Sequence, residues 1–153
     1  MANYVYIATS LDGFIATCEG GLDWLSEIPN TEQSYFGYAE FISGIDAILM
    51  GRNTFQKVLT FGTWPYDKPV FVLGNTLVSV PENVADKTEI VNGEVRMLVD
   101  QLNKRGYHNL YVDGGSVIQS FLEEDLIDEM IITRVPILLG DGIPLFGKLT
   151  QSF

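Results

Sequence analysis

Cysteine is almost absent from this sequence, and long apolar runs are missing altogether. Cys18 is the single cysteine, so the chain can form no internal disulfide and no cysteine-based metal cluster. No stretch approaches the roughly 20 apolar residues that a membrane-spanning helix requires. The opening residues, MANYVYIATS, lack the positive segment and cleavage site of a signal peptide and are typical of a strand. These absences predict a protein of the reducing cytoplasm.

Positive charge is also scarce. Nine Lys and Arg residues oppose twenty Asp and Glu residues, which gives a formal net charge of −11. Nucleic-acid binding needs a basic surface that displaces counterions, so this class of partner is disfavoured, as is an anionic membrane surface. A phosphorylated small ligand remains possible, because a few backbone N–H groups and one or two arginines can hold it.

Strand-like and helical patterns alternate along the 153 residues, of which 46% are hydrophobic. This length and composition suit a single domain with an ordinary core. The alternation predicts an α/β fold with three layers, a mostly parallel sheet carrying helices on both faces. The expected strands are Tyr4–Ser10, Ile45–Met50, Pro69–Leu73, Thr88–Val91, Asn109–Asp113 and 128–138, and the expected helices are 31–43, 53–59, 94–106 and 116–124.

Three of the expected strands end in glycine and small polar residues, at 51–54, 74–75 and 113–116. Ligands of open parallel sheets bind beyond the carboxyl ends of the strands, so these turns are candidate anion sites. At 113–116 the two glycines allow backbone to approach a diphosphate at a helix N-terminus, or they only permit a tight turn. The Arg52 guanidinium can bind a phosphate through two N–H groups. Alternatively, Arg52 is a solvated residue, and Thr54 caps the N-terminus of the following helix. The three turns together predict an extended ligand with several phosphates, such as a dinucleotide.

Three further residues invite a chemical interpretation. Asp12 follows the first strand and is a candidate for orienting a substrate or relaying a proton, although Asp-Gly is commonly a simple turn. His108, alone near the start of a strand, is typical of a surface residue. Cys18 has no neighbouring histidine in the sequence, which disfavours a nucleophile. We find no spacing of His, Asp or Glu that indicates a metal site.

The strings SLDGFIA, DW, MGRNTF, VDGGSVIQSFL and DEMIITRVPILLGDGIPLF together resemble the dihydrofolate-reductase-like superfamily. The closest branch is the bacterial proteins related to the reductase domain of riboflavin biosynthesis. The resemblance covers nearly the whole chain in order. It implies an enzyme, an NADPH-dependent oxidoreductase, and it implies NADPH as the cofactor.

The resemblance also implies which residues hold this cofactor. Arg52 and Thr54 would contact a cofactor phosphate, and the turn after the strand 109–113 would hold the diphosphate. Leu73, Gly74 and Asn75 would flank the adenosine end, and Ala8 and Ile15 would lie near the nicotinamide. The full set of expected cofactor-binding residues is Ala8, Ile15, Gly51, Arg52, Asn53, Thr54, Leu73, Gly74, Asn75, Asp113, Gly114, Gly115, Ser116 and Val117, with Asp12 as the catalytic candidate.

Two departures from the family pattern shape the expected function. Dihydrofolate reductases carry an acidic residue on the helix before the MGR strand, whereas Tyr35 stands at that place here. The family usually continues past LTQSF into a final strand pair, so we expect a single domain, 1–153, without this pair. A long strand at 128–138 would then lie at an unprotected edge and pair with another chain, which predicts a homodimer.

The expected activity is hydride transfer to a small heterocyclic or ribosylated substrate, as in a 5-amino-6-(5-phosphoribosylamino)uracil reductase. Dihydrofolate reduction is an alternative that the missing carboxylate disfavours. A non-catalytic nucleotide-binding protein is a second alternative. A flavodoxin-like electron carrier also suits an acidic α/β chain, but it needs a phosphate loop that opens a helix after the first strand, and TSLDGFIATCEGG has no helical pattern.

Overall fold

The computed structural model describes residues 2–22, 24, 37–61, 63–74, 81–150 and 152. Its main sheet has the order β5-β4-β3-β6-β1-β7, and each neighbouring pair runs parallel. The strands are β1 (Ala2–Ser10), β3 (Ala47–Gly51), β4 (Val70–Leu73), β5 (Thr88–Val91), β6 (Asn109–Asp113) and β7 (Glu129–Val135). The predicted parallel α/β sheet is therefore confirmed.

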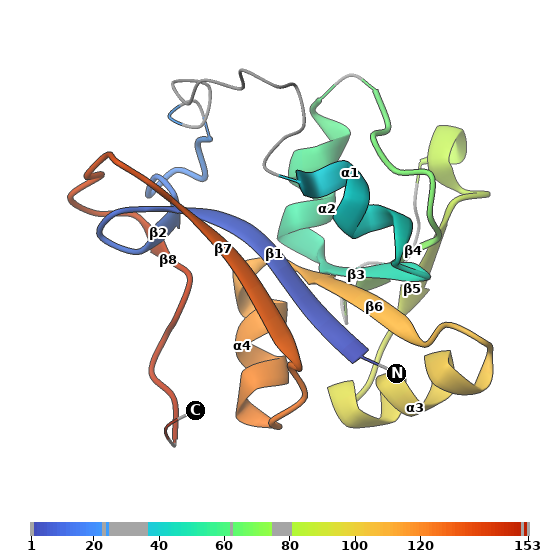
Figure 1. Ribbon diagram of the computed structural model, residues 1–153. Helices are drawn as coiled ribbons and strands as arrows, with labels where there is room; N and C mark the ends of the chain where they lie inside the picture. The colour runs from blue at the N-terminus through green and yellow to red at the C-terminus, as the bar shows by residue number, and fades with distance from the viewer. Residues whose placement is uncertain are drawn as a thin grey trace.

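Helices cover both faces of this sheet (Figure 1). The helices α1 (Tyr38–Ser43) and α2 (Arg52–Leu59) lie on one face, and α3 (Val95–Lys104) and α4 (Gly115–Glu123) lie on the other. A short 3₁₀ helix, η3 (Glu82–Val84), precedes β5. The helices α3 and α4 bury apolar residues three and four positions apart, as their sequence patterns predict. Among the described helices, none has the length and apolar character needed to cross a bilayer.

The strands differ sharply in burial, and the difference follows their position in the sheet. All five residues of the central strand β3 are buried, because helices cover both of its faces. The edge strand β7 is mostly exposed, and its Ile131 and Ile132 side chains are 41% and 36% accessible. Within the main sheet, β7 is therefore the least protected of the described strands.

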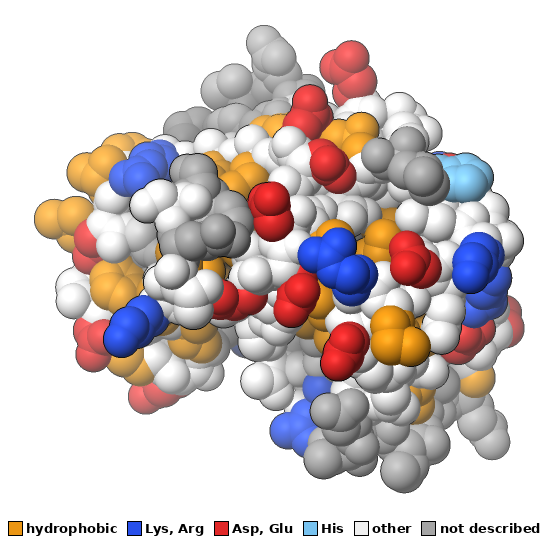
Figure 2. Space-filling view, turned by 90° about the horizontal axis from the view of Figure 1, so that it is seen from below, with side chains coloured by type: hydrophobic (Ala, Val, Ile, Leu, Met, Phe, Trp, Pro, Cys, Tyr) orange, Lys and Arg blue, Asp and Glu red, His pale blue; other side chains and the backbone are white. Residues whose placement is uncertain are grey.

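Acidic side chains are spread among basic ones over the face that carries α3 and α4 (Figure 2).

Several boundaries differ from those that the sequence predicts. The strand expected at 128–138 ends at Val135, because Pro136 has no N–H to continue the ladder. The helix expected at 31–43 is described only from Tyr38 onward, and its predicted first half lies outside the described residues. The strand expected at Ile45–Met50 runs two residues later at its start and one later at its end.

A second, two-stranded sheet replaces two segments that the sequence pattern predicts as loops. Strand β2 (Phe14–Ala16) pairs antiparallel with β8 (Ile143–Pro144), although about 130 residues separate them. The Leu145 N–H also donates to the Gly13 carbonyl at 3.1 Å, and Leu11 N–H donates to Ile137 O at 2.8 Å. The two segments beyond the carboxyl ends of β1 and β7 are thus tied together, as Figure 1 shows at the left of the sheet.

The topology determines where a ligand can enter. The chain leaves β3 through α2 on one face and leaves β6 through α4 on the opposite face. These two strands are neighbours, with Met50 paired to Asp113, so their connections diverge from one point at the carboxyl edge. Open α/β sheets bind ligands at such a point.

Candidate active site

Two helices begin side by side where β3 and β6 end. The helix α2 starts at Arg52, immediately after Gly51, and α4 starts at Gly115, immediately after Gly114. The first N–H groups of an α-helix have no partner within the helix, and the helix dipole makes this end positive. Two such ends facing one space favour an anionic ligand there.

The two turns are in contact, and this contact requires glycine. Gly114 has φ 98° and ψ 134°, and a Cβ atom at this position would overlap the Thr54 hydroxyl. A Cβ atom on Gly51 would stand 3.0 Å from the Val117 Cγ2 atom. The positive φ lies at Gly114, whereas Gly115 is the first residue of the helix and has no such conformation. The first glycine therefore serves the turn, and the second lies at the start of α4, where a Cβ atom would stand 3.1 Å from the Ile15 Cδ1 atom.

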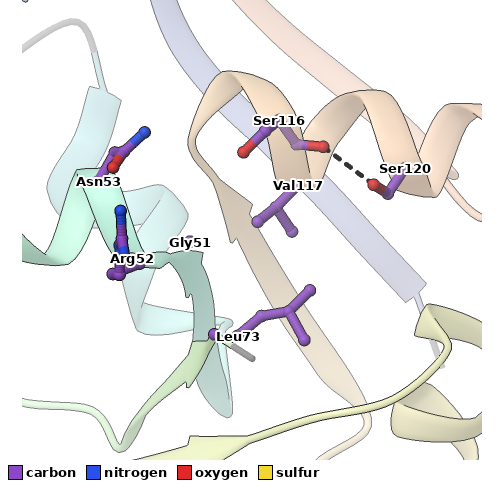
Figure 3. A pocket seen from close by; sticks show the side chains of 8 residues that line it. Gly51, Arg52, Asn53, Leu73, Ser116, Val117 and Ser120 are labelled. Atoms are coloured by element: carbon purple, nitrogen blue, oxygen red, sulfur yellow. Dashed lines mark hydrogen bonds between the residues drawn. The ribbon is translucent and has the colours of Figure 1, made fainter. Parts of the chain in front are cut away.

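A cavity of about 350 Å³ lies between the two helix starts. Figure 3 shows Arg52 and Asn53 on one side, Ser116 and Ser120 on the other, and Leu73 and Val117 between them. Seven of the residues that line it were predicted from the sequence, namely Gly51, Arg52, Asn53, Leu73, Gly74, Ser116 and Val117. The eighth, Ser120, was missed, although it lies one turn after Ser116 and its hydroxyl donates to the Ser116 carbonyl at 3.0 Å.

A larger cavity, of about 960 Å³, continues from the first and shares Gly51, Asn53 and Ser116 with it. It includes the predicted residues Ile15, Thr54, Asp113, Gly114 and Gly115. Sequence reasoning missed most of the others, among them Ile7, Glu19, Leu22, Lys57, Val58, Phe61, Tyr66, Gln119 and the segment 143–145. The two cavities together form one groove along the carboxyl edge of the sheet.

Asp113 places a carboxyl group in the larger cavity. Burial raises its pKa to about 6, although the Gly114 N–H partly offsets this effect. Tyr38, Tyr66 and Tyr111 interact electrostatically with it, and burial raises the pKa of each phenol, that of Tyr38 to about 12. The phenols therefore stay protonated at neutral pH, while Asp113 can both give and accept a proton near neutrality.

Asp12, the residue predicted to be catalytic, lines neither cavity. Its carboxylate accepts hydrogen bonds from the Ser10 hydroxyl at 2.6 Å, from the Gly140 N–H at 2.9 Å and from the Leu139 N–H at 3.2 Å. The Ser10 hydroxyl and these backbone groups lower the pKa of Asp12. An exposed carboxylate with a lowered pKa is a poor proton donor. The geometry favours a positioning role, in which Asp12 ties the loop after β1 to the loop after β7.

The remaining predicted residues divide between the groove and its surroundings. Ala8 lines neither cavity, whereas its neighbour Ile7 lines the larger one, because successive strand residues point to opposite faces. Asn75 lies outside the described residues, so its predicted contact with the adenosine end is not described. Cys18 lines the larger cavity, and its hydrogen bond to Asp141 raises the pKa of the thiol.

The fold and groove define an α/β domain with a candidate ligand site at the switch point of a parallel sheet. Comparison with protein families finds that residues 4–152 match the RibD C-terminal domain. The chain therefore belongs to the RibD C-terminal domain family, within the dihydrofolate-reductase-like superfamily.

Similar proteins agree with this assignment. The chain is 38% identical to the uncharacterized protein YwjB of Bacillus subtilis over 97% of its own length and 84% of that protein. A crystal structure from Shewanella sp. PV-4, whose name assigns it provisionally to riboflavin biosynthesis, is 53% identical with a TM-score of 0.95. That match covers 99% of this chain and 86% of the other. A Thermotoga maritima deaminase and 5-amino-6-(5-phosphoribosylamino)uracil reductase shares the fold at 19% identity and a TM-score of 0.74, over 99% of this chain and 49% of its own.

Proposed function

We propose that this chain is an NADPH-dependent oxidoreductase of the riboflavin-pathway reductase type. It transfers hydride to a small heterocyclic or ribosylated substrate that resembles 5-amino-6-(5-phosphoribosylamino)uracil. One observation carries the proposal: two helix starts and Arg52 face a groove that opens into a larger cavity containing the Asp113 carboxyl. The family membership supports the same class of activity.

The residues around the smaller cavity fit the phosphate groups of a dinucleotide. Gly114 and Gly115 carry no side chains of their own at the start of α4, so backbone N–H groups there can donate to a diphosphate. Ser116 adds a hydroxyl, and Arg52 adds a guanidinium suited to a phosphate monoester such as the 2′-phosphate of NADPH. Leu73 and Val117 offer apolar surface to the sugar or adenine.

The larger cavity supplies the rest of the chemistry. When bound, the reduced nicotinamide supplies a hydride. Ile7 and Ile15 exclude water from the reacting atoms with their apolar surface. The Asp113 carboxyl gives a proton to the nitrogen or oxygen of the bond that is reduced, and it recovers a proton from solvent. Its pKa of about 6 leaves a usable protonated fraction at neutral pH.

The direct test follows absorbance at 340 nm while purified protein, NADPH and candidate heterocycles are mixed. We expect oxidation of NADPH that depends on the substrate. Dihydrofolate is included as a comparison substrate and is expected to react slowly, since the acidic residue of dihydrofolate reductases is absent from its usual place in the sequence. Tight NADPH binding with no turnover of any candidate would favour the non-catalytic alternative.

Replacing Arg52 by alanine is expected to weaken NADPH binding by roughly ten- to a hundredfold and to leave NADH binding nearly unchanged. The loss of one charge-assisted contact costs about 1.5–3 kcal/mol, which corresponds to this range. Isothermal titration with the two cofactors measures it. Lys87→Ala serves as a matched control, because Lys87 is exposed and outside both cavities. Equal losses for NADPH and NADH would show that Arg52 does not contact the 2′-phosphate.

We further propose that the protein is a cytoplasmic homodimer that covers β7. Replacing Ile131 and Ile132 by lysine is expected to convert the dimer to monomers, since lysines on an exposed edge strand block pairing with another chain. Light scattering at micromolar concentration measures the mass. Met97→Lys is the control, because Met97 is 57% exposed on α3, away from β7. A monomeric wild-type protein, or a double variant of unchanged mass, would contradict this assembly.

A further inference from the structure

Few basic side chains are available to the larger cavity. The stretches outside the described residues contain no Lys, Arg or His, so every basic side chain of the chain belongs to the described part. Of the nine Lys and Arg residues, Arg52 lines the smaller cavity and Lys57 lines the larger one. The larger cavity therefore has a single basic side chain available to a substrate.

The other arginines are engaged elsewhere. Arg105 forms a bidentate pair with Glu89 at 2.8 and 3.1 Å, and Arg96 lies 3.6 Å from Glu124. Arg134, at the carboxyl end of β7, donates to the Leu11 carbonyl at 3.0 Å. None of these three guanidinium groups lines the groove, so none is placed to bind a second phosphorylated ligand there.

Among the described residues, two carboxyl groups oppose the single cation of the larger cavity. Glu19 and Asp113 line it together with Lys57, and both add negative charge when they are ionised. A phosphate monoester carries close to two negative charges and needs several charge-assisted donors once it leaves water. The helix starts that line the same cavity are assigned to the cofactor diphosphate, so a second phosphate would meet two carboxyl groups and one cation.

Flat aromatic and branched apolar side chains line the same cavity. Tyr66 belongs to its wall and packs edge-on against Trp64, with ring centroids 5.4 Å apart and an interplanar angle of 79°. Trp64 in turn meets Phe55 edge-on at 6.1 Å, so the position of Tyr66 is braced by the core. Ile7 and Ile15 add apolar surface. Such walls suit a planar ring, with a few polar groups fixing its orientation.

Resting on the proposed function, we propose that the larger cavity selects an unphosphorylated, uncharged heterocycle whose reducible nitrogen or oxygen lies within reach of the Asp113 carboxyl. The substrate then shares the ring of a phosphoribosylaminopyrimidine and lacks its phosphate. Arg52, in the smaller cavity, is left to the cofactor.

Two probes that differ only in phosphate test this selection: 5-amino-6-ribitylaminouracil and its 5′-phosphate. Binding of each to the protein saturated with NADPH is measured by isothermal titration at pH 7.5. We expect the phosphate-free probe to bind at least tenfold more tightly. It should also slow alkylation of Cys18 by N-ethylmaleimide, because this single cysteine lines the larger cavity. Equal or tighter binding of the phosphate, or binding of neither probe, overturns the proposal.

A charge substitution in the cavity tests the same electrostatic selection. Its result does not depend on the ring of the probe, because both probes carry the same ring. Glu19→Lys places a second cation in the cavity and is expected to shift the preference toward the phosphorylated probe by at least tenfold. Asp100→Lys makes a similar change at an exposed position of α3 and should keep the wild-type preference. An unchanged preference in Glu19→Lys contradicts the electrostatic selection.

Different measurements can refute the proposed NADPH-dependent function and the proposed substrate class. Titration of NADPH alone reports the proposed function, and a protein that does not bind this cofactor refutes it. The probes are then titrated without cofactor, and Cys18 protection still reports their entry into the cavity. A protein that binds NADPH but prefers the phosphorylated probe retains the proposed function and loses the substrate class.

Discussion

Replacing Gly115 by valine is expected to abolish NADPH binding, with a loss of at least about a hundredfold, while the domain stays folded. Gly115 lines the larger cavity at the start of α4 and has no positive φ, so a side chain is compatible with its backbone. A Cβ atom there would stand 3.1 Å from the Ile15 Cδ1 atom, the flexible end of a side chain that can move. The valine methyl groups would instead occupy the space through which a diphosphate reaches the helix N–H groups.

Two glycine variants separate this effect from folding. Gly44→Val alters an exposed glycine with φ −92° outside the groove, and it should bind NADPH like the wild type. Gly114→Val should instead lose stability, because its positive φ and its contact with Thr54 leave no room for a side chain. Circular dichroism confirms folding and titration gives the affinity. Full affinity in folded Gly115→Val would mean that the Gly-Gly turn serves packing only.

Replacing Asp113 by asparagine is expected to reduce turnover by about 10²–10⁴-fold, the usual contribution of a general acid. In the wild type, turnover should fall as the pH rises through about 6, because the protonated form of Asp113 is lost. The variant should lack this step. A pH profile of turnover with saturating NADPH measures both effects. An unchanged profile in the variant would assign the proton to another group.

The same substitution should stabilise the protein above pH 6. The pKa of Asp113 lies near 6 in the folded protein, above its ordinary value of 3.8, so the folded state binds more protons between these values. Stability therefore falls as the pH rises from about 4 to about 6. The shift corresponds to about 3 kcal/mol, and residual solvent contact lowers the expected gain of Asp113→Asn at pH 8 to about 2 kcal/mol. Below pH 4 the two proteins should unfold at nearly the same temperature.

Asp12→Asn is the matched control, because its pH dependence has the opposite sign. Hydrogen bonds from Ser10, Gly140 and Leu139 lower the pKa of Asp12 in the folded protein. Its ionised form thus contributes stability above its ordinary pKa, and this contribution is lost as the pH falls through the lowered value. The variant should be less stable than the wild type at pH 7 and approach it in acid. Stabilisation by Asp12→Asn at pH 7 would contradict the hydrogen-bonding pattern.

Local patterns in the sequence were sufficient to predict most helices and strands, and to predict the residues at the two helix starts that border the groove. The spacing of Val95, Leu98, Val99 and Leu102 predicts α3, since these residues fall on one helical face, and all four are buried. The strand exits at 51–54 and 113–116 were predicted to meet a common ligand, and the pairing of β3 with β6 brings them together. Both inferences rest on residues that are close in sequence.

The larger cavity could not be predicted in the same way. Tyr66 enters it from a loop with no periodic pattern, and β8 consists of two residues whose partner strand lies far away in the chain. The sequence could not distinguish Ile7 from Ala8, because β1 lies between two helix layers and carries apolar residues on both faces. The raised pKa of Asp113 depends on its burial in the folded chain, so the residue type alone did not reveal it.

The place of β1 between β6 and β7 has a consequence for synthesis on the ribosome. This strand emerges before every other strand of the sheet, yet its partners, residues 109–111 and 129–135, emerge more than a hundred residues later. Until then its unpaired edges are open to other chains, and closing more than a hundred residues of intervening chain is slow. The apolar strands that fold around it remain exposed for the same interval. Production of this protein should therefore respond more strongly to chaperone supply and growth temperature than its modest size suggests.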